Sequence, residues 1–186
     1  MYVMVFTLVM SQTAWPDDTD NARELIQSRL EAVISVLQKK DTDKQVKNKE
    51  IIEIVSPMFD FSLMARLTLG KKYWPALTKE KKERFTELFV ERLKTSYVEK
   101  LALYTDEQIV YKAPVRIKKK IHLPTEIISK DSNISMLYKL YKSKNNWKVY
   151  DIEIQGVSII TTYRSQFDQV LSSGTIDDLL LKLEKI

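Results

Sequence analysis

Two carboxylates and one histidine are the side chains whose types and spacing could do chemistry. Asp151 and Glu153 stand two residues apart in an apolar stretch, so a β-strand would place both on one face about 7 Å apart. Such a pair could act as acid and base in glycoside hydrolysis, and His122 could act as a general base. No pattern of substrate-binding aromatic residues flanks them. A small enzyme that acts on an apolar substrate through Asp151 and His122 is therefore the second hypothesis, and we expect no catalytic residue.

The composition of the 186 residues excludes several other kinds of chemistry. The chain has no cysteine and one histidine, which removes thiolate nucleophiles, disulfides and His-based metal triads. Its three glycines are too far apart for a phosphate-binding loop. The net charge is +5, but the lysines form only short runs and no nucleic-acid-binding module accompanies them. We expect no metal, no cofactor and no nucleic-acid partner.

The N-terminus has the length and character of an export signal. Residues 2–10 are apolar and too short to span a bilayer, and small and polar residues follow up to Ala14. This pattern predicts a signal-peptide remnant over residues 1–14 and a single domain over 15–186. The alternative is a buried N-terminal strand.

Apolar residues at helical spacing fill the first half of the chain. Asn21 and Glu24 resemble a capping box before a first helix, and a short second helix is expected around residues 49–55, after a polar connection. Asp60 or Ser62 is expected to begin a third helix that Gly70 terminates. The longest helix follows Thr78, and its apolar stripe consists of Phe85, Phe89, Leu93, Tyr97, Leu101 and Tyr104.

From residue 108 the apolar residues alternate, which is typical of strands. A strand over residues 115–123 would place four apolar residues on one face, and Arg116, Lys118, Lys120 and His122 on the other. Further strands are expected over 125–130, 134–142 and 147–155, separated by turn-forming clusters.

Two helices are expected to close the chain. Ser158 caps the first, and a capping box of Thr175 and Asp178 begins the second. The predicted fold class is therefore α+β: N-terminal helices, an antiparallel sheet of about four or five strands and closing C-terminal helices, with an apolar pocket between sheet and helices.

Two segments carry a family resemblance. The first reads Phe59-Asp60-Phe61-x-x-Met64-Ala65-Arg66-x-x-Leu69-Gly70, with Trp74 and the long helix after it. The second reads Trp147-Lys148-Val149-Tyr150-Asp151, then Gly156-Val157-Ser158, then Tyr163-Arg164-Ser165-Gln166-Phe167. Both resemble the MlaC family of envelope phospholipid-binding proteins, also called the toluene-tolerance auxiliary family. In family order they cover the chain from about Asn21 to its end.

The resemblance implies a carrier rather than an enzyme. Members of the family carry a glycerophospholipid through the periplasm between an outer-membrane lipoprotein complex and an inner-membrane ABC transporter complex with an MCE-domain subunit. This transport maintains the lipid asymmetry of the outer membrane. Some relatives are associated with hopanoids, so another lipid remains an alternative cargo. The implied localisation is periplasmic, and the only bound molecule is the phospholipid cargo.

A carrier must shield acyl chains from water. Each exposed methylene costs about 0.8 kcal/mol, so a chain of about sixteen carbons would cost about 12 kcal/mol. We therefore expect an apolar wall, and Arg164 near the mouth as a contact for the head group or the membrane. The expected wall consists of Met64, Leu67, Phe89, Leu93, Tyr97, Leu101, Tyr138, Leu140, Ile152, Val157, Ile160 and Tyr163.

Overall fold

The computed structural model describes residues 18–101, 108–129 and 133–185, without the side chains of residues 99–101. The expected signal segment, residues 1–14, and Tyr104 lie outside the described residues. The described residues form six α-helices and one six-stranded antiparallel sheet, which confirms the predicted α+β class.

Four helices precede the sheet and two follow it. They are α1 (Asp18–Leu37), α2 (Lys44–Val55), α3 (Phe61–Tyr73), α4 (Lys79–Leu101), α5 (Ile159–Leu171) and α6 (Ile176–Glu184). Short 3-10 turns at Ser56–Met58 and Trp74–Ala76 follow α2 and α3. None of the helices that the structure describes is both long and apolar enough to cross a lipid bilayer.

The sheet has the strand order β1-β3-β4-β5-β6, and β2 pairs with β3 on the same side as β1. Its strands are β1 (Gln108–Tyr111), β2 (Val115–Ile117), β3 (Lys120–Ile128), β4 (Asn133–Ser143), β5 (Asn146–Ile154) and β6 (Val157–Ser158). A bulge between Lys139 and Leu140 shifts the register of β4 against β5. A short turn joins β4 to β5, as the turn-forming cluster there predicts. The cluster expected between β3 and β4 includes residues 130–132, which lie outside the described residues.

Most of the predicted helix starts are confirmed by hydrogen bonds. The Asp60 carboxylate accepts from the Leu63 N–H at 2.8 Å, and the Ser158 hydroxyl accepts from the Thr161 N–H at 3.1 Å. Thr175 and Asp178 form the complete capping box. Each of these caps joins residues three apart, so local sequence was enough to find it.

Two predicted helix starts are wrong. Helix α1 begins at Asp18, so Asn21 and Glu24 lie inside it instead of capping it. Helix α2 begins at Lys44 instead of near residue 49, because the Asp43 carboxylate accepts from the Gln45 N–H at 2.7 Å. The helix thus begins at the aspartate cap, even though its first turn is polar.

The predicted single strand over residues 115–123 is also wrong. A two-residue turn, with Lys118 at φ 57°, separates β2 from β3 and reverses the chain. Val115 consequently pairs with His122, and Ile117 pairs with Lys120. Residues directly opposite each other share a face. Val115 and Ile117 therefore lie on the polar face with His122 and Lys120, and they are 52% and 44% exposed.

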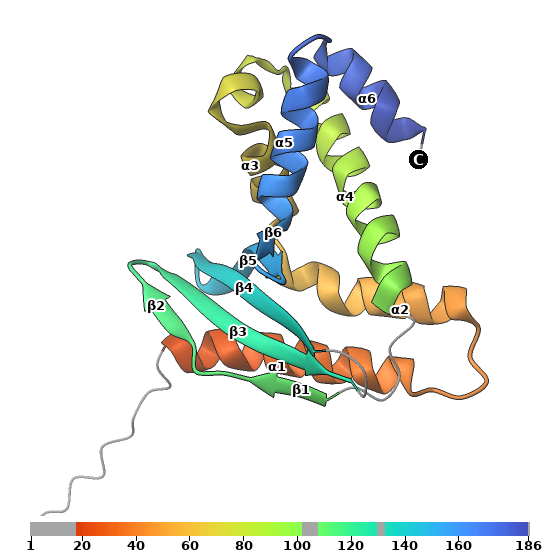
Figure 1. Ribbon diagram of the computed structural model, residues 1–186, viewed down its shortest axis with the longest axis vertical. Helices are drawn as coiled ribbons and strands as arrows, with labels where there is room; N and C mark the ends of the chain where they lie inside the picture. The colour runs from red at the N-terminus through yellow and green to blue at the C-terminus, as the bar shows by residue number, and fades with distance from the viewer. Residues whose placement is uncertain (1–17, 102–107, 130–132, 186) are drawn as a thin grey trace, which may run out of the picture.

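The helices fall into two groups around the sheet. Helix α1 lies along one face of the sheet, while α3, α4, α5 and α6 stand as a column beside it (Figure 1). One buried apolar cluster links the column, α1 and the sheet. A second, smaller cluster joins α1 and α2 to the end of α4 through Val33, Val36, Ile51 and Val98. The column therefore stands on the layer formed by α1, α2 and the sheet.

Candidate functional site

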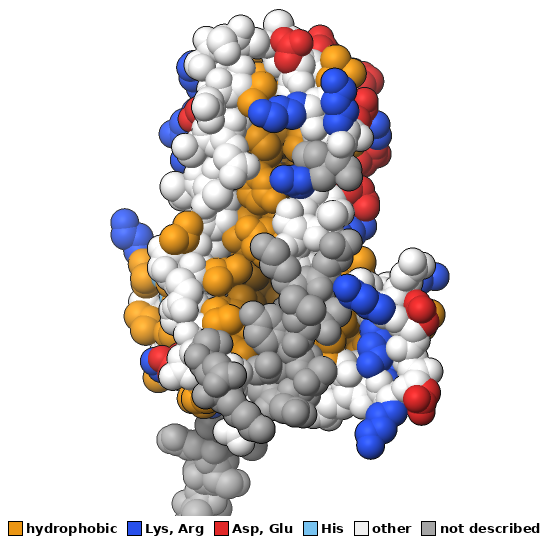
Figure 2. Space-filling view, turned by 45° about the vertical axis from the view of Figure 1, so that its right-hand side comes forward, with side chains coloured by type: hydrophobic (Ala, Val, Ile, Leu, Met, Phe, Trp, Pro, Cys, Tyr) orange, Lys and Arg blue, Asp and Glu red, His pale blue; other side chains and the backbone are white. Residues whose placement is uncertain are grey.

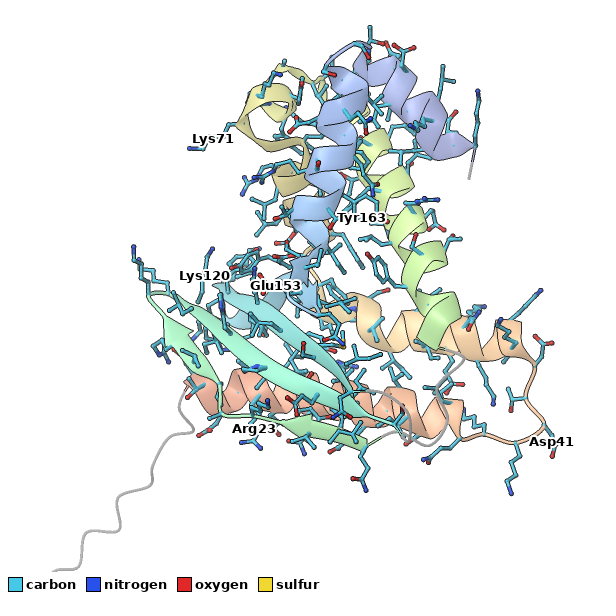
Figure 3. All side chains as sticks on the ribbon, in the orientation of Figure 1. Arg23, Asp41, Lys71, Lys120, Glu153 and Tyr163 are labelled. Atoms are coloured by element: carbon cyan, nitrogen blue, oxygen red, sulfur yellow. The ribbon has the colours of Figure 1, made fainter. Side chains whose placement is uncertain are left out.

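An aromatic seam joins α4 to α5. The ring centroids of Phe89 and Tyr163 are 5.3 Å apart with an interplanar angle of 89°, and those of Phe85 and Phe167 are 5.5 Å apart at 80°. These are edge-to-face contacts, which aromatic pairs favour. Tyr163 points from α5 towards α4 (Figure 3), where its hydroxyl lies 3.4 Å from that of Ser96.

The two helices of the seam diverge towards the sheet. Helices α4 and α5 are close at the top of the column and spread apart as they approach the sheet (Figure 1). On the face turned forward in Figure 2, hydrophobic side chains form a continuous band from the column down to the level of the sheet. Tyr97, one turn beyond Leu93 on α4, is half-buried against the large apolar cluster, and burial raises the pKa of its hydroxyl. A continuous apolar surface of this kind is typical of sites that bind apolar ligands.

The sheet contributes hydroxyl groups that lack protein partners. Tyr111 and Thr125 are paired residues of β1 and β3, and both hydroxyls are buried with no hydrogen-bond partner among the described residues. Among the described residues, the nearby Tyr138 hydroxyl reaches only the sulfur of Met136, at 3.8 Å, and burial raises the pKa of this hydroxyl above its ordinary value. Buried hydroxyls are normally satisfied, so water or a ligand is the expected partner. The sequence indicated Tyr138 as a wall residue, but no pattern indicated Tyr111 or Thr125.

Most of the expected wall residues belong to the large buried cluster. Buried in it are Met64, Phe89, Leu93, Tyr138, Leu140, Ile152, Ile160 and Tyr163. Leu67 and Tyr97 pack against the cluster and are partly buried. The side chain of Leu101 lies outside the described residues.

Val157 differs from the other expected wall residues. Its side chain is 60% exposed, because β6 is a two-residue strand at the sheet margin, and it cannot line an interior wall. It lies at an open depression lined mainly by polar residues, which are Glu153, Ser158, Thr161, Thr162, Ser165 and Gln166, with Gly156. Val157 therefore lies outside the buried apolar cluster.

Arg164 has a structural partner. Its guanidinium donates to the Leu67 carbonyl, with the Nε atom at 2.9 Å, just before α3 is interrupted at Gly70. Gly70 adopts φ 62° and ψ −167°, a conformation that is essentially restricted to glycine. Arg164 thus joins α5 to the break in α3, while its exposed position leaves other guanidinium N–H groups accessible.

The carboxylates considered for catalysis form a structural network instead. Asp151 accepts from the Ser158 hydroxyl at 2.8 Å, the Ile160 N–H at 3.2 Å and the Lys139 ammonium at 3.0 Å. Glu153 also pairs with Lys139. The interactions with Ser158 and with the Ile160 N–H hold the start of α5 on the sheet, and the ion pair with Lys139 ties β5 to β4. Within the described residues, no group of three or more acidic or histidine side chains is arranged to hold a metal ion.

His122 lies on the same face as this network. Burial, followed by the charge of Lys139, lowers the pKa of His122 below its ordinary value of 6.5. The folded protein therefore takes up a proton less readily than the unfolded chain. The resulting stability is present above pH 6.5 and is lost as the pH falls below that value, through the folded-state pKa.

We predict that His122→Gln makes the free energy of unfolding less dependent on pH below 6.5. Urea unfolding of both proteins at several pH values measures this slope. The effect is small, because the imidazole is only partly buried. Identical slopes in both proteins would show that His122 does not contribute.

Comparison with known proteins decides the family. The model of the MlaC protein family matches residues 27–185. The chain belongs to the MlaC family. The match includes both segments whose motifs indicated the resemblance, together with α4 and the whole sheet.

A solved structure supports the fold of this MlaC-family protein. The phospholipid-binding protein from Ralstonia solanacearum, determined in complex with a phospholipid, superposes with a TM-score of 0.81. The two chains are 23% identical, and the match covers 89% of this chain and 96% of the other. The column, the sheet and their relative placement are thus the family's fold.

Proposed function

We propose that this protein is a carrier that binds a glycerophospholipid between α4, α5 and the sheet. The observation that carries the proposal is the apolar band between these elements (Figure 2) in a chain of the MlaC family. The similar fold of a phospholipid-binding protein from Ralstonia solanacearum supports it. Binding and release, rather than catalysis, is consistent with the structural use of Asp151.

Acyl chains require a wall that replaces the bilayer along most of their length. At about 0.8 kcal/mol per methylene, leaving even a quarter of a sixteen-carbon chain in water would cost about 3 kcal/mol. The aromatic and aliphatic side chains at the α4–α5 seam provide such a wall. In this proposal Leu93, Tyr97, Ile160 and Tyr163 contact the chains, and the deeper residues support them.

In this proposal three hydroxyls on the sheet form a polar region of the site. Tyr111, Thr125 and Tyr138 could donate to the ester carbonyls of a glycerophospholipid, which are acceptors without a donor of their own. The charged head group then remains near the surface, where water solvates it. Arg164 is the proposed head-group contact, through the N–H groups that Leu67 does not use.

The family match also supports a proposal for where the carrier acts. We propose that it is exported by the segment over residues 1–14 and acts in the periplasm. There it would receive and deliver lipid at an inner-membrane MCE-domain ABC transporter complex and an outer-membrane lipoprotein complex, which maintains outer-membrane lipid asymmetry. A hopanoid is the alternative cargo, because it too is a long apolar molecule.

Extraction of the purified protein into organic solvent, followed by mass spectrometry of the lipids, tests the proposal. We expect glycerophospholipid in an amount comparable to that of the protein, while a lipid-free protein purified in parallel yields only background. Recovery of hopanoid would identify the alternative cargo. Absence of any lipid, both after purification and after incubation with phospholipid vesicles, would contradict the carrier function.

A further inference from the structure

Two lysine-rich hairpin tips lie side by side at one end of the sheet. One tip is residues 115–120, around the β2–β3 turn, and the other is residues 141–148, around the β4–β5 turn. Lys120 pairs with Tyr141, and Ser143 pairs with Asn146, so both turns point the same way. Figure 1 shows the two turns together, projecting beyond α1.

The net positive charge of the chain comes entirely from these two tips. Together they contain seven Lys or Arg residues and no Asp or Glu, which are Arg116, Lys118, Lys119, Lys120, Lys142, Lys144 and Lys148. The whole chain has a net charge of +5, so all the remaining residues together carry −2. The positive charge is therefore a local feature of this end of the sheet, not a general property of the surface.

Only part of this charge is neutralised within the protein. The Asp18 carboxylate lies 2.7 Å from the Lys142 ammonium and 3.8 Å from the Arg116 guanidinium. Lys120 stacks over the Tyr150 ring at 4.3 Å, which leaves its charge unpaired. Among the described residues, no carboxylate pairs with Lys118, Lys119 or Lys144. Like charges this close repel each other, so an anionic partner would relieve a cost present in the free protein.

Apolar side chains accompany the lysines. Val115 and Ile117 are exposed on the β2 edge strand, on the same face as Lys120. Exposed lysine next to exposed valine and isoleucine suits the interface of a bilayer, where ammonium groups meet phosphates and aliphatic groups enter the acyl boundary. A single-stranded nucleic acid would instead favour exposed aromatic residues for stacking, whereas the two aromatic residues of the tips are buried (Trp147) or partly buried (Tyr141).

We propose that the two hairpin tips form a docking surface for anionic phospholipid bilayers. Contact with a membrane is a property beyond lipid carriage, and it does not require the seam between α4 and α5 to bind a ligand. Docking would bring the protein to the membrane surface by electrostatic attraction, which salt weakens. In the free protein, the lysines would also prevent the edge strand β2 from pairing with a strand of another chain.

Cosedimentation of the full protein with vesicles tests the docking surface. Phosphatidylcholine vesicles with phosphatidylglycerol are compared with pure phosphatidylcholine vesicles at low salt. The tip variant is Lys118→Asp combined with Lys119→Glu, since aspartate tolerates the positive φ of Lys118. We expect the unmodified protein to prefer anionic vesicles, and the tip variant to bind them about thirtyfold or more weakly.

A matched variant separates local charge from net charge. Lys40→Asp combined with Lys44→Glu makes the same charge change at exposed sites beside Asp41, at the far end of the α1–α2 layer from Lys120 (Figure 3). It should alter vesicle binding by no more than about twofold. Equal loss in both variants, or no preference for anionic vesicles in the unmodified protein, would overturn the proposal. So would retention on immobilised polyanion without vesicle binding.

Discussion

Asp151→Ala is expected to lower the free energy of unfolding by about 3 kcal/mol. The Asp151 side chain is 4% exposed and accepts hydrogen bonds from Ser158, from the Ile160 N–H and from Lys139. Alanine would leave the Ile160 N–H of α5 without its acceptor. The partly buried ammonium of Lys139 would lose one of its two carboxylate partners. Domains of this size are stable by about 5–15 kcal/mol, so the loss is a large fraction of the total.

Glu153→Ala is the matched control, because Glu153 pairs with the same lysine but does not reach α5. Its side chain is more exposed than that of Asp151, so the expected loss is about 1 kcal/mol. Urea unfolding followed by circular dichroism measures both values. Equal losses would show that the contact of Asp151 with the start of α5 adds nothing to its ion pair.

Local signals explain why most of the fold could be predicted. The Asp60, Ser158 and Thr175 caps each act on residues within the next turn, so the sequence around them contains both partners. The apolar stripe of α4 likewise follows from its own spacing. The β2–β3 hairpin was predicted as a single strand, because a turn of two lysines lacks the Asn-Gly or Gly residues that usually mark such turns.

The site is less predictable because it depends on distant contacts. Apolar residues that line a ligand site and those that fill a core have the same spacing on a helix, so the stripe on α4 could not separate Leu93 from Phe85. The structural role of Asp151 depends on a helix start seven to nine residues away, beyond the sheet exit. The clustering of seven basic residues requires the pairing of β3 with β4, which brings two separate hairpin tips together.

Leu93→Trp is expected to reduce the amount of lipid that copurifies with the protein at least fivefold. Leu93 is 8% exposed on α4, in the cluster that includes Phe89 and Tyr163. The larger indole would take up volume between α4 and α5 that the acyl chains are proposed to fill. Overpacking of this kind lowers the free energy of unfolding by about 1–3 kcal/mol. Leu181→Trp is the control, because Leu181 is 54% exposed on α6 and the same change there leaves the seam unaltered.

Ile160→Phe tests the same space from the opposite helix and remains informative if Leu93→Trp does not fold. Ile160 is buried at the start of α5, so its added ring volume enters the seam from the other side. If the acyl chains lie between α4 and α5, both variants must lose lipid, because each adds side-chain volume between the same two helices. Native mass spectrometry gives the occupancy, and thermal unfolding identifies the variants that remain folded. Full occupancy in a folded Ile160→Phe protein would place the chains elsewhere and leave the α4–α5 seam as ordinary core.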